Sequence, residues 1–131
     1  MGEKEERKTG LVNGKFHPCP QKKVCVSTQS PPTDDDHYIE PIKMRNSITE
    51  AKDKMKDIIS SIKRTKLLEE TENYLHYVFK TFLFRFKDDV EFLFDKDEDL
   101  IHFRSQSRIG GFDWGKNRKR MEEIRDLYSQ K

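Results

Sequence analysis

The chain lacks any apolar run long enough to cross a bilayer, and its start, M-G-E-K-E-E-R-K, lacks the apolar core of a signal peptide. As written, we expect a soluble chain. Proline is absent after residue 41, and all five prolines lie between residues 18 and 41. Each proline removes a backbone donor and favours an extended conformation in the preceding residue. The sequence thus predicts a single domain with an extended, proline-rich arm over residues 1–46 and a body over residues 47–131.

Apolar residues are few, at 33% of 131 residues, whereas charged residues make up 38%. Such a composition favours disorder when the apolar residues are scattered. Here they are concentrated, since eight of the fourteen aromatic residues lie within residues 74–94. A platform for single-stranded nucleic acid would also use aromatic rings, but no RNA-recognition signature is present and the net charge is only +2. We therefore expect a packed core and no nucleic-acid partner.

The body begins with a predicted helix. Ser47-Ile48-Thr49-Glu50 fits a capping box, and apolar residues then recur at helical spacing to about Arg64. A second predicted helix starts near Asp113, a plausible N-cap. Its expected inner side carries Trp114, Met121, Ile124, Leu127 and Tyr128.

Two hairpins are predicted between these helices. Residues 66–71 and 74–81 form the first, and the second has residues 95–99 as its loop. Period-two geometry then sets Phe94 opposite Ile101, Phe92 opposite Phe103 and Glu91 opposite Arg104. The path of residues 82–87 stays open between a strand continuation and an apolar loop. The order predicts an α+β fold, a four-stranded antiparallel meander sheet with two helices packed on one face.

The segment from Arg104 to Arg120, R-S-Q-S-R-I-G-G-F-D-W-G-K-N-R-K-R, has the densest charge in the chain. It holds six cations and one acid, so it carries +5 while the remainder carries about −3. Glycines and a helix start offer amide donors, and arginines offer forked donors, which together suit a phosphate, sulfate or carboxylate. The candidate ligand residues are Arg104, Arg108, Arg118 and Arg120.

Three interpretations of this segment remain open. In the first, a non-enzymatic module binds an anionic ligand or partner, with Asp88, Asp89 and Glu91 orienting the arginines. In the second, the same carboxylates form an internal network with Arg104, Arg108 and Arg118 that only stabilises the fold. In the third, Asp89 and Glu91 perform acid–base work on a bound anion. Ser105 and Ser107 should face inward, and no base is placed to activate either serine.

Only two cysteines occur, Cys19 and Cys25. Their C-x5-C spacing does not match zinc hooks, and His17 and His37 do not complete a ligand pattern. The acidic turn at residues 34–37 lacks the spacing of a calcium loop. We therefore predict no metal and no cofactor. A disulfide is sterically possible in an exported protein, while free thiols are expected in a cytosolic one.

Five ordered motifs, taken together, resemble domain-of-unknown-function family 1499, an uncharacterised family of bacteria and photosynthetic lineages. They are H-P-C-P-Q-K-K-V-C-V-S, D-D-D-H-Y-I-E-P-I, D-D-V-E-F, R-S-Q-S-R-I-G and D-W-G-K-N-R-K-R-M-E-E-I, and the resemblance spans roughly residues 10 to 128. Trp114 and the doubled glycine at 110 and 111 depart from the family's pattern.

The resemblance implies no activity, but it adds residues and a compartment. The family's characteristic polar positions fall on the segment already chosen and add Asn117 to the ligand residues and Asp113 to the orienting carboxylates. Many members look exported or lipid-anchored, which implies a Cys19–Cys25 disulfide and an extracytoplasmic or membrane-anchored full-length protein. Membrane attachment is then expected only through a leader absent from this chain.

Overall fold

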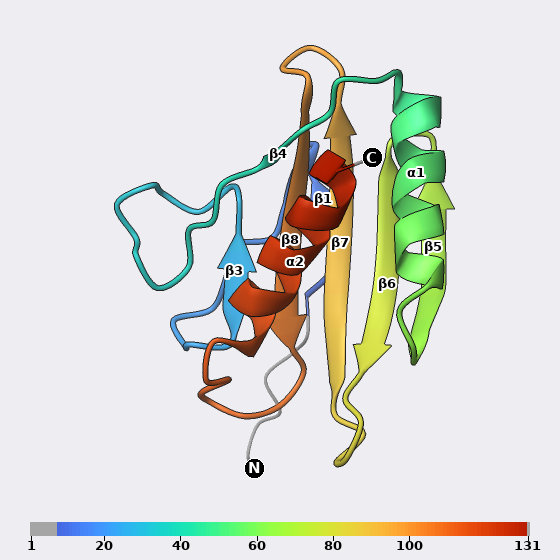
Figure 1. Cartoon of the computed structure of the whole chain (residues 1–131). Coiled ribbons are helices and arrows are strands. Elements are labelled where there is room, and N and C mark those ends of the chain that lie inside the picture. Colours follow the sequence, from blue (N-terminus) through green and yellow to red (C-terminus); the bar gives the residue numbers. More distant parts are fainter. Residues whose placement is uncertain (1–7, 131) are drawn as a thin grey trace.

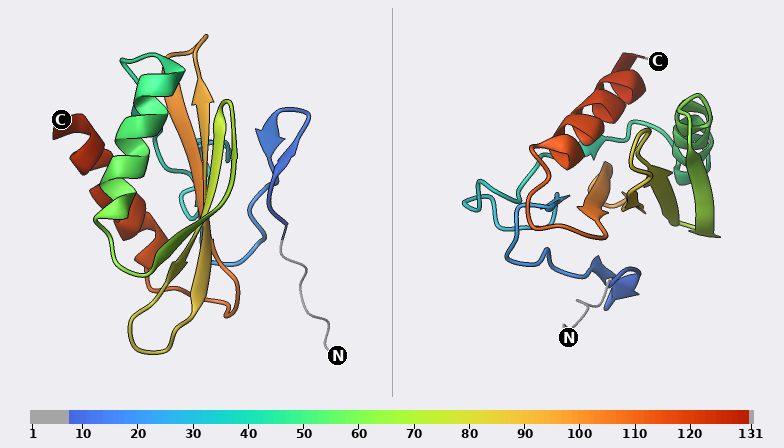
Figure 2. Two further views of the ribbon diagram at one scale, coloured as in Figure 1. Left: turned by 90° about the vertical axis from the view of Figure 1, so that its right-hand side faces the viewer. Right: turned by 90° about the horizontal axis from the view of Figure 1, so that it is seen from below.

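The computed structural model describes residues 8–130. The fold is α+β, with a central sheet that carries two helices on one face and a short hairpin on the other (Figures 1 and 2). In chain order the elements are β1 (Leu11–Val12), β2 (Lys15–Phe16), β3 (Cys25–Ser27), β4 (Ile42–Lys43), α1 (Ile48–Ser60), β5 (Thr65–Thr71), β6 (Tyr74–Lys80), β7 (Lys87–Asp95), β8 (Leu100–Ser107) and α2 (Lys116–Gln130).

The central sheet has six strands, so the prediction of a four-stranded sheet was wrong. The meander β5-β6-β7-β8 is present, but β3 and β4 also pair antiparallel with β8. Both extra strands come from the segment that the prolines marked as an arm. They are two and three residues long, too short to show a periodic pattern, and they cover an edge of β8 that would otherwise expose unpaired backbone groups.

Both predicted hairpins are confirmed. The register of β7 and β8 sets Phe94 against Ile101, Phe92 against Phe103 and Glu91 against Arg104. The first hairpin turns at residues 72–73, between β5 and β6. Of residues 82–87, whose path was left open, residues 82–86 lie in the loop between β6 and β7, and Lys87 begins β7.

The capping box of α1 is confirmed, since the Ser47 hydroxyl accepts from the Glu50 amide and the Glu50 carboxylate accepts from the Ser47 amide. The helix ends at Ser60, earlier than predicted, because the chain must turn to enter β5.

Helix α2 begins at Lys116, three residues after the predicted cap. Trp114 is 86% exposed, so its predicted inner position was wrong; with φ of +58° it lies in the turn before the helix. Leu127 is also exposed, beside a narrow buried stripe of Met121, Ile124 and Tyr128. No helix within residues 8–130 is long and apolar enough to span a membrane.

Strand β7 is buried on both faces. On the face under the helices, Val90, Phe92 and Phe94 join the main core. On the opposite face, Leu93 packs with Tyr74 and with Phe16 of the β1–β2 hairpin. Because each face is covered, Asp88, Asp89 and Glu91 are buried whichever face they are on.

Candidate functional site

The predicted site residues divide between the two faces of the sheet. Neighbouring residues of a strand point to opposite faces. Asp88 therefore lies on the helix face with Ser105, while Asp89 and Glu91 lie on the other face with Arg104. The carboxylates that were expected to act as one orienting set form separate clusters on two sides of the sheet.

On the helix face, Asn117 is fully buried and joins α2 to the sheet. Its side-chain oxygen accepts a hydrogen bond from Ser105 Oγ at 2.6 Å, and its Nδ2 donates to Ser107 Oγ at 3.0 Å. The same Nδ2 donates to the Val24 carbonyl and to Asp113 Oδ2. The Asp113 carboxylate also accepts from the Gly115 amide, so it closes the turn before α2 even though the helix starts later. The two inward serines thus mark the docking point of a helix.

Asp88 is the second anchor on the helix face, with no exposed surface. Arg120 Nη2 donates to its carboxylate at 2.6 Å, and Lys116 Nζ lies 3.2 Å away. The Arg120 guanidinium also lies over the Phe79 ring, 4.9 Å from its centroid, and donates to Ser105 and Asn117. Arg120 is therefore engaged inside the molecule.

On the opposite face, Arg104 is 1% exposed. Its Nη1 lies 3.5 Å from Glu91 Oε1, and its Nη2 donates to the Gln106 side chain at 2.7 Å and to the Pro18 carbonyl at 3.2 Å. Its Nε finds no hydrogen-bond partner among residues 8–130. Burial lowers the pKa of the Arg104 guanidinium, and the charge of Glu91 opposes that shift.

Glu91 is held from three directions. Besides Arg104, the Tyr74 hydroxyl donates to Glu91 Oε2 at 2.5 Å and the Gly10 amide donates to the same oxygen at 2.7 Å. Burial raises the pKa of the Tyr74 phenol, and the neighbouring Glu91 charge raises it further. Sequence reasoning missed Tyr74 because its partner is seventeen positions away and gives no local pattern.

Asp89 lies between Arg108 and His76, and both contact its carboxylate. Arg108 binds it with a fork, Nε to Oδ2 and Nη2 to Oδ1, both at 3.0 Å, and His76 Nε2 lies 2.9 Å from Oδ1. Burial alone would raise the pKa of Asp89, but the hydrogen bonds from His76 and Arg108 outweigh burial and lower it to about 2. Asp89 is therefore ionised at neutral pH.

Arg118 does not pair with the β7 carboxylates, so that part of the network prediction was wrong. Its Nη2 donates to the Asp35 carbonyl at 3.2 Å. It lines a pocket of about 160 Å³ with Lys23, Phe112 and Gly115. Asp35, Asp36 and Asp113 line the same pocket, so its charge is mixed.

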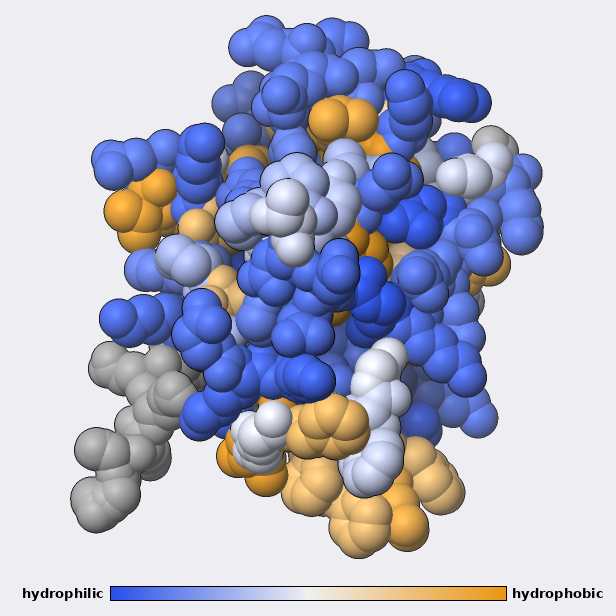
Figure 3. Space-filling view, turned by 90° about the vertical axis from the view of Figure 1, so that its left-hand side faces the viewer, coloured by the Kyte–Doolittle hydropathy of each residue, from blue (hydrophilic) through white to orange (hydrophobic). Residues whose placement is uncertain are grey.

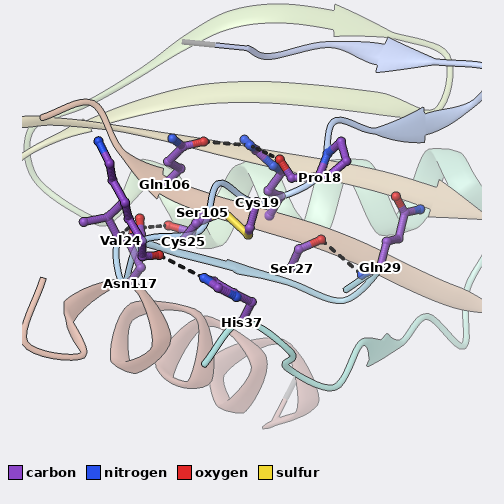
Figure 4. Close-up of a disulfide and its surroundings, with 12 residues drawn as sticks. Pro18, Cys19, Val24, Cys25, Ser27, Gln29, His37, Ser105, Gln106 and Asn117 are labelled. Atoms are coloured by element: carbon purple, nitrogen blue, oxygen red, sulfur yellow. Dashed lines mark hydrogen bonds between the residues drawn. A yellow bond between two sulfur atoms is a disulfide. The ribbon is translucent and has the colours of Figure 1, made fainter. Parts of the chain in front are cut away.

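Cys19 and Cys25 form a disulfide, with their Cα atoms 5.7 Å apart (Figure 4). The bond ties the segment before β3 to the first residue of β3, next to the Pro18 carbonyl that accepts from Arg104. The turn at residues 34–37 is held by buried His37, whose Nδ1 lies 2.8 Å from Asp34 and whose Nε2 lies 2.9 Å from the Lys22 carbonyl. Burial would lower the pKa of His37, but these two acceptors raise it overall.

One group that could hold a metal ion was not anticipated. Asp95, Glu98 and His102, at the turn between β7 and β8, bring a carboxylate oxygen or an imidazole nitrogen each within 4.8 Å of one another. His102 Nε2 lies 3.0 Å from Glu98, and its Nδ1 lies 2.8 Å from the Thr28 hydroxyl. Glu98 is exposed, and such acidic groups are common on surfaces without any metal.

The family model described as "Protein of unknown function (DUF1499)" matches residues 15–127. No curated protein and no solved structure shows significant similarity to the chain. The matched range includes the disulfide, the arginine–carboxylate pairs on both faces of the sheet and most of α2. The chain therefore belongs to the DUF1499 family, whose description assigns no function.

Proposed function

We propose that this domain is a non-enzymatic binding module for an anionic partner, which docks where the Arg104–Arg120 segment turns from β8 into α2. One observation carries the proposal. At this end of the sheet, cations such as Lys87 and Lys119 are exposed, whereas the neighbouring acids Asp88 and Asp89 are buried and already paired. Lys87 and Lys119 therefore remain as exposed positive charges next to acids that are already neutralised by Arg108 and Arg120.

The proposal assigns different roles to the predicted ligand residues. Arg104, Arg120 and Asn117 hold the segment in place, since their polar groups are directed into the molecule. Arg108 and Arg118, which keep some exposure, are the residues that contact the partner, with Lys116 and Lys119 beside them. This division follows from burial, because a cation without accessible surface cannot meet a ligand.

The pairing of the carboxylates supports binding over acid–base catalysis. A general acid at neutral pH needs a carboxyl group with a raised pKa. The pKa of Asp89 is lowered to about 2 by His76 and Arg108, against the effect of burial. Such a carboxylate suits the permanent orientation of an arginine.

The disulfide supports an extracytoplasmic location for the module. Structural disulfides persist in oxidising compartments and are rare in the cytosol. Cys25 is buried within β3, so the bond is part of the folded arm. An exported or lipid-anchored full-length protein is consistent with that placement.

A thermal-shift titration with inorganic phosphate, citrate and polyphosphate tests the proposal. We expect at least one anion class to raise the melting temperature of the wild-type domain. The gain should shrink in Arg118→Gln/Lys119→Gln, which changes a half-buried and an exposed cation of α2. The matched control Lys43→Gln/Lys96→Gln removes two exposed cations at the other end of the sheet and should keep the gain.

Arg108→Ala separates binding from a purely structural network. The proposal expects it to lose both melting temperature and anion stabilisation. If no anion stabilises any form of the domain, and Arg108→Ala only lowers the melting temperature, the arginines serve the fold alone and the proposal is wrong.

A further inference from the structure

Large apolar side chains are exposed at one end of the molecule. Phe82, Leu83, Phe84 and Phe86 come from the β6–β7 loop, and Phe82 is 72% exposed. Ile109, Phe112 and Trp114 come from the β8–α2 loop, and all three are more than half exposed. We call these seven residues the apolar tip. A patch of this kind on a charge-rich protein marks an interaction site.

The two loops are neighbours because of the sheet register. Asp88 at the start of β7 pairs with Ser107 at the end of β8, and the Arg108 amide donates to the Lys87 carbonyl at 3.0 Å. One loop enters β7 where the other leaves β8. Both loops lie at the lower end of the molecule in Figure 1, and Figure 3 shows apolar side chains gathered at that end.

The apolar tip is ordered in its exposed position. The β6–β7 loop is closed by hydrogen bonds from the Thr81 amide to the Phe86 carbonyl and from the Phe86 amide to the Thr81 hydroxyl. The Phe84 and Phe86 rings stack at 5.4 Å, and Phe112 meets Trp114 edge to face at 4.7 Å. The rings are therefore held outward by local contacts before any partner arrives.

Cations flank the β6–β7 loop of the tip, whereas Phe112 on the other loop lies beside a pocket of mixed charge. The loop sequence K-T-F-L-F-R-F-K over residues 80–87 holds three cations and no acid, and K-R-T-K over residues 63–66 adds three more. Arg64 reaches the loop directly, with its guanidinium 5.2 Å from the Phe82 ring centroid. Exposed Phe and Leu side chains flanked by lysine and arginine fit an interface where acyl chains lie below negative headgroups.

We propose that the apolar tip inserts into the surface of an anionic lipid bilayer. This inference rests on the proposed function, since it names the anionic partner, but its apolar part rests on the two loops alone. Two copies of the tip would bring like charges together, which disfavours self-association. Single-stranded nucleic acid stacks on ring faces, and here one face each of Phe84 and Phe86 is taken by their mutual stacking and one face of Phe82 by Arg64.

Trp114 supplies a direct readout, because it is the single tryptophan of the chain and lies in the tip. With vesicles of equal parts phosphatidylcholine and phosphatidylglycerol, we expect its emission to shift to shorter wavelength and the protein to sediment with the lipid. Binding should be weaker on phosphatidylcholine alone, and added salt should weaken it only on the anionic vesicles.

Variants of exposed residues locate the contact. Phe82→Ser/Leu83→Ser/Phe84→Ser should weaken vesicle binding by about a hundredfold or more, because burying one such side chain is worth at least about tenfold. Arg85→Gln/Lys87→Gln should weaken binding to anionic vesicles by roughly tenfold or more. The control Val12→Ser/Leu68→Ser removes two exposed apolar groups outside the tip and should bind like the wild type.

Each contrary outcome has its own meaning. Vesicle binding that survives the triple serine variant overturns the inference. No vesicle binding together with stabilisation by polyphosphate overturns the lipid partner and leaves the anionic partner in place. A Trp114 shift that depends on protein concentration alone indicates a second copy, and binding to an oligothymidylate that the triple variant abolishes indicates nucleic acid; either overturns the inference. If lipid binding is lost in the triple serine variant but kept in Arg118→Gln/Lys119→Gln, the inference about the apolar tip is supported. The same result contradicts the proposal that Arg118 and Lys119 of α2 contact the partner.

Discussion

Three buried acids of β7 each meet a cation from a different part of the chain. Asp88 is paired by Arg120 of α2, Asp89 by Arg108 beyond the end of β8, and Glu91 by Arg104 across the strand pair. Removing one partner of a buried pair leaves the other charge uncompensated, which costs far more than a surface ion pair is worth. The function of these pairs within the fold is to neutralise the acids of β7 that are buried on the two faces of the sheet.

Asp89 should make the stability of the domain depend on acid pH. Its pKa is lowered from 3.8 to about 2 in the fold, since His76 and Arg108 outweigh burial. The stabilisation is therefore complete above the unfolded value and is lost as pH falls through about 4 toward 2, amounting to about 2 kcal/mol. Urea unfolding of wild type and Asp89→Asn between about pH 5 and pH 2 measures the difference.

The control for that experiment is Asp53→Asn, an exposed change on α1. It should follow the wild-type profile, whereas Asp89→Asn should start lower at high pH and converge with the wild type in acid. Parallel profiles for wild type and Asp89→Asn would mean that the pairing of Asp89 adds nothing to stability.

Among the elements, α2 depends most on polar contacts. Its buried apolar stripe is narrow, and its first turn is fixed by Asn117, which bonds β8 through Ser105 and Ser107 and reaches the Val24 carbonyl before β3. The orientation of this helix places Arg118 and Lys119 at the proposed binding surface. Docking of α2 therefore links stability to the candidate function.

Asn117→Ala should destabilise the domain by about 2–3 kcal/mol, because the buried groups it serves lose their partners. The free energy of unfolding in urea measures this loss. Lys119→Ala, an exposed change on the same helix, should stay within about 0.5 kcal/mol of the wild type. A small effect at Asn117 would show that the apolar stripe alone docks the helix.

The molecule as a whole is a sheet covered on one face by α1 and α2 and on the other by the β1–β2 hairpin and the segment that follows it (Figure 2). The arm supplies Phe16, the Gly10 amide and the Pro18 carbonyl to the second face. The Cys19–Cys25 disulfide fixes the end of this segment to β3 and so restricts its movement away from the sheet. The part of the arm from Gly10 to Pro18 thus keeps Glu91 and Arg104 from solvent.

Cys19→Ser/Cys25→Ser should lower the free energy of unfolding by about 2 kcal/mol through loop entropy. Its effect should be uneven, so hydrogen exchange is the informative measurement. The Ser107 amide, which donates to the Val24 carbonyl, should exchange faster, while amides between β6 and β7 should change only with global stability. Equal acceleration throughout the sheet would show that the disulfide does not act locally on the arm.

Local patterns accounted for much of this fold. The capping box at Ser47 and Glu50 depends on residues three apart, and the β7–β8 register depends on alternation across one short turn, so both could be read from neighbouring residues. The charge count likewise found the segment that meets the β7 acids. Family membership, too, rested on motifs in sequence order, and the family model matches.

Contacts between residues far apart in the sequence could not be predicted from local patterns and were seen only in the tertiary structure. The pairing of β3 and β4 with β8, the bond from Gly10 to Glu91 across 81 positions and the outward placement of Trp114 depend on which surfaces meet after the chain has folded. A charged residue looks the same in sequence whether it is buried in a pair or exposed. By itself the sequence determined the periodic elements and the location of the charge. The packing of the β1–β2 segment and of α2 on opposite faces of the sheet decided that Arg104 and Arg120 point inward. The apolar tip stays exposed, because burial is set by contacts between distant segments.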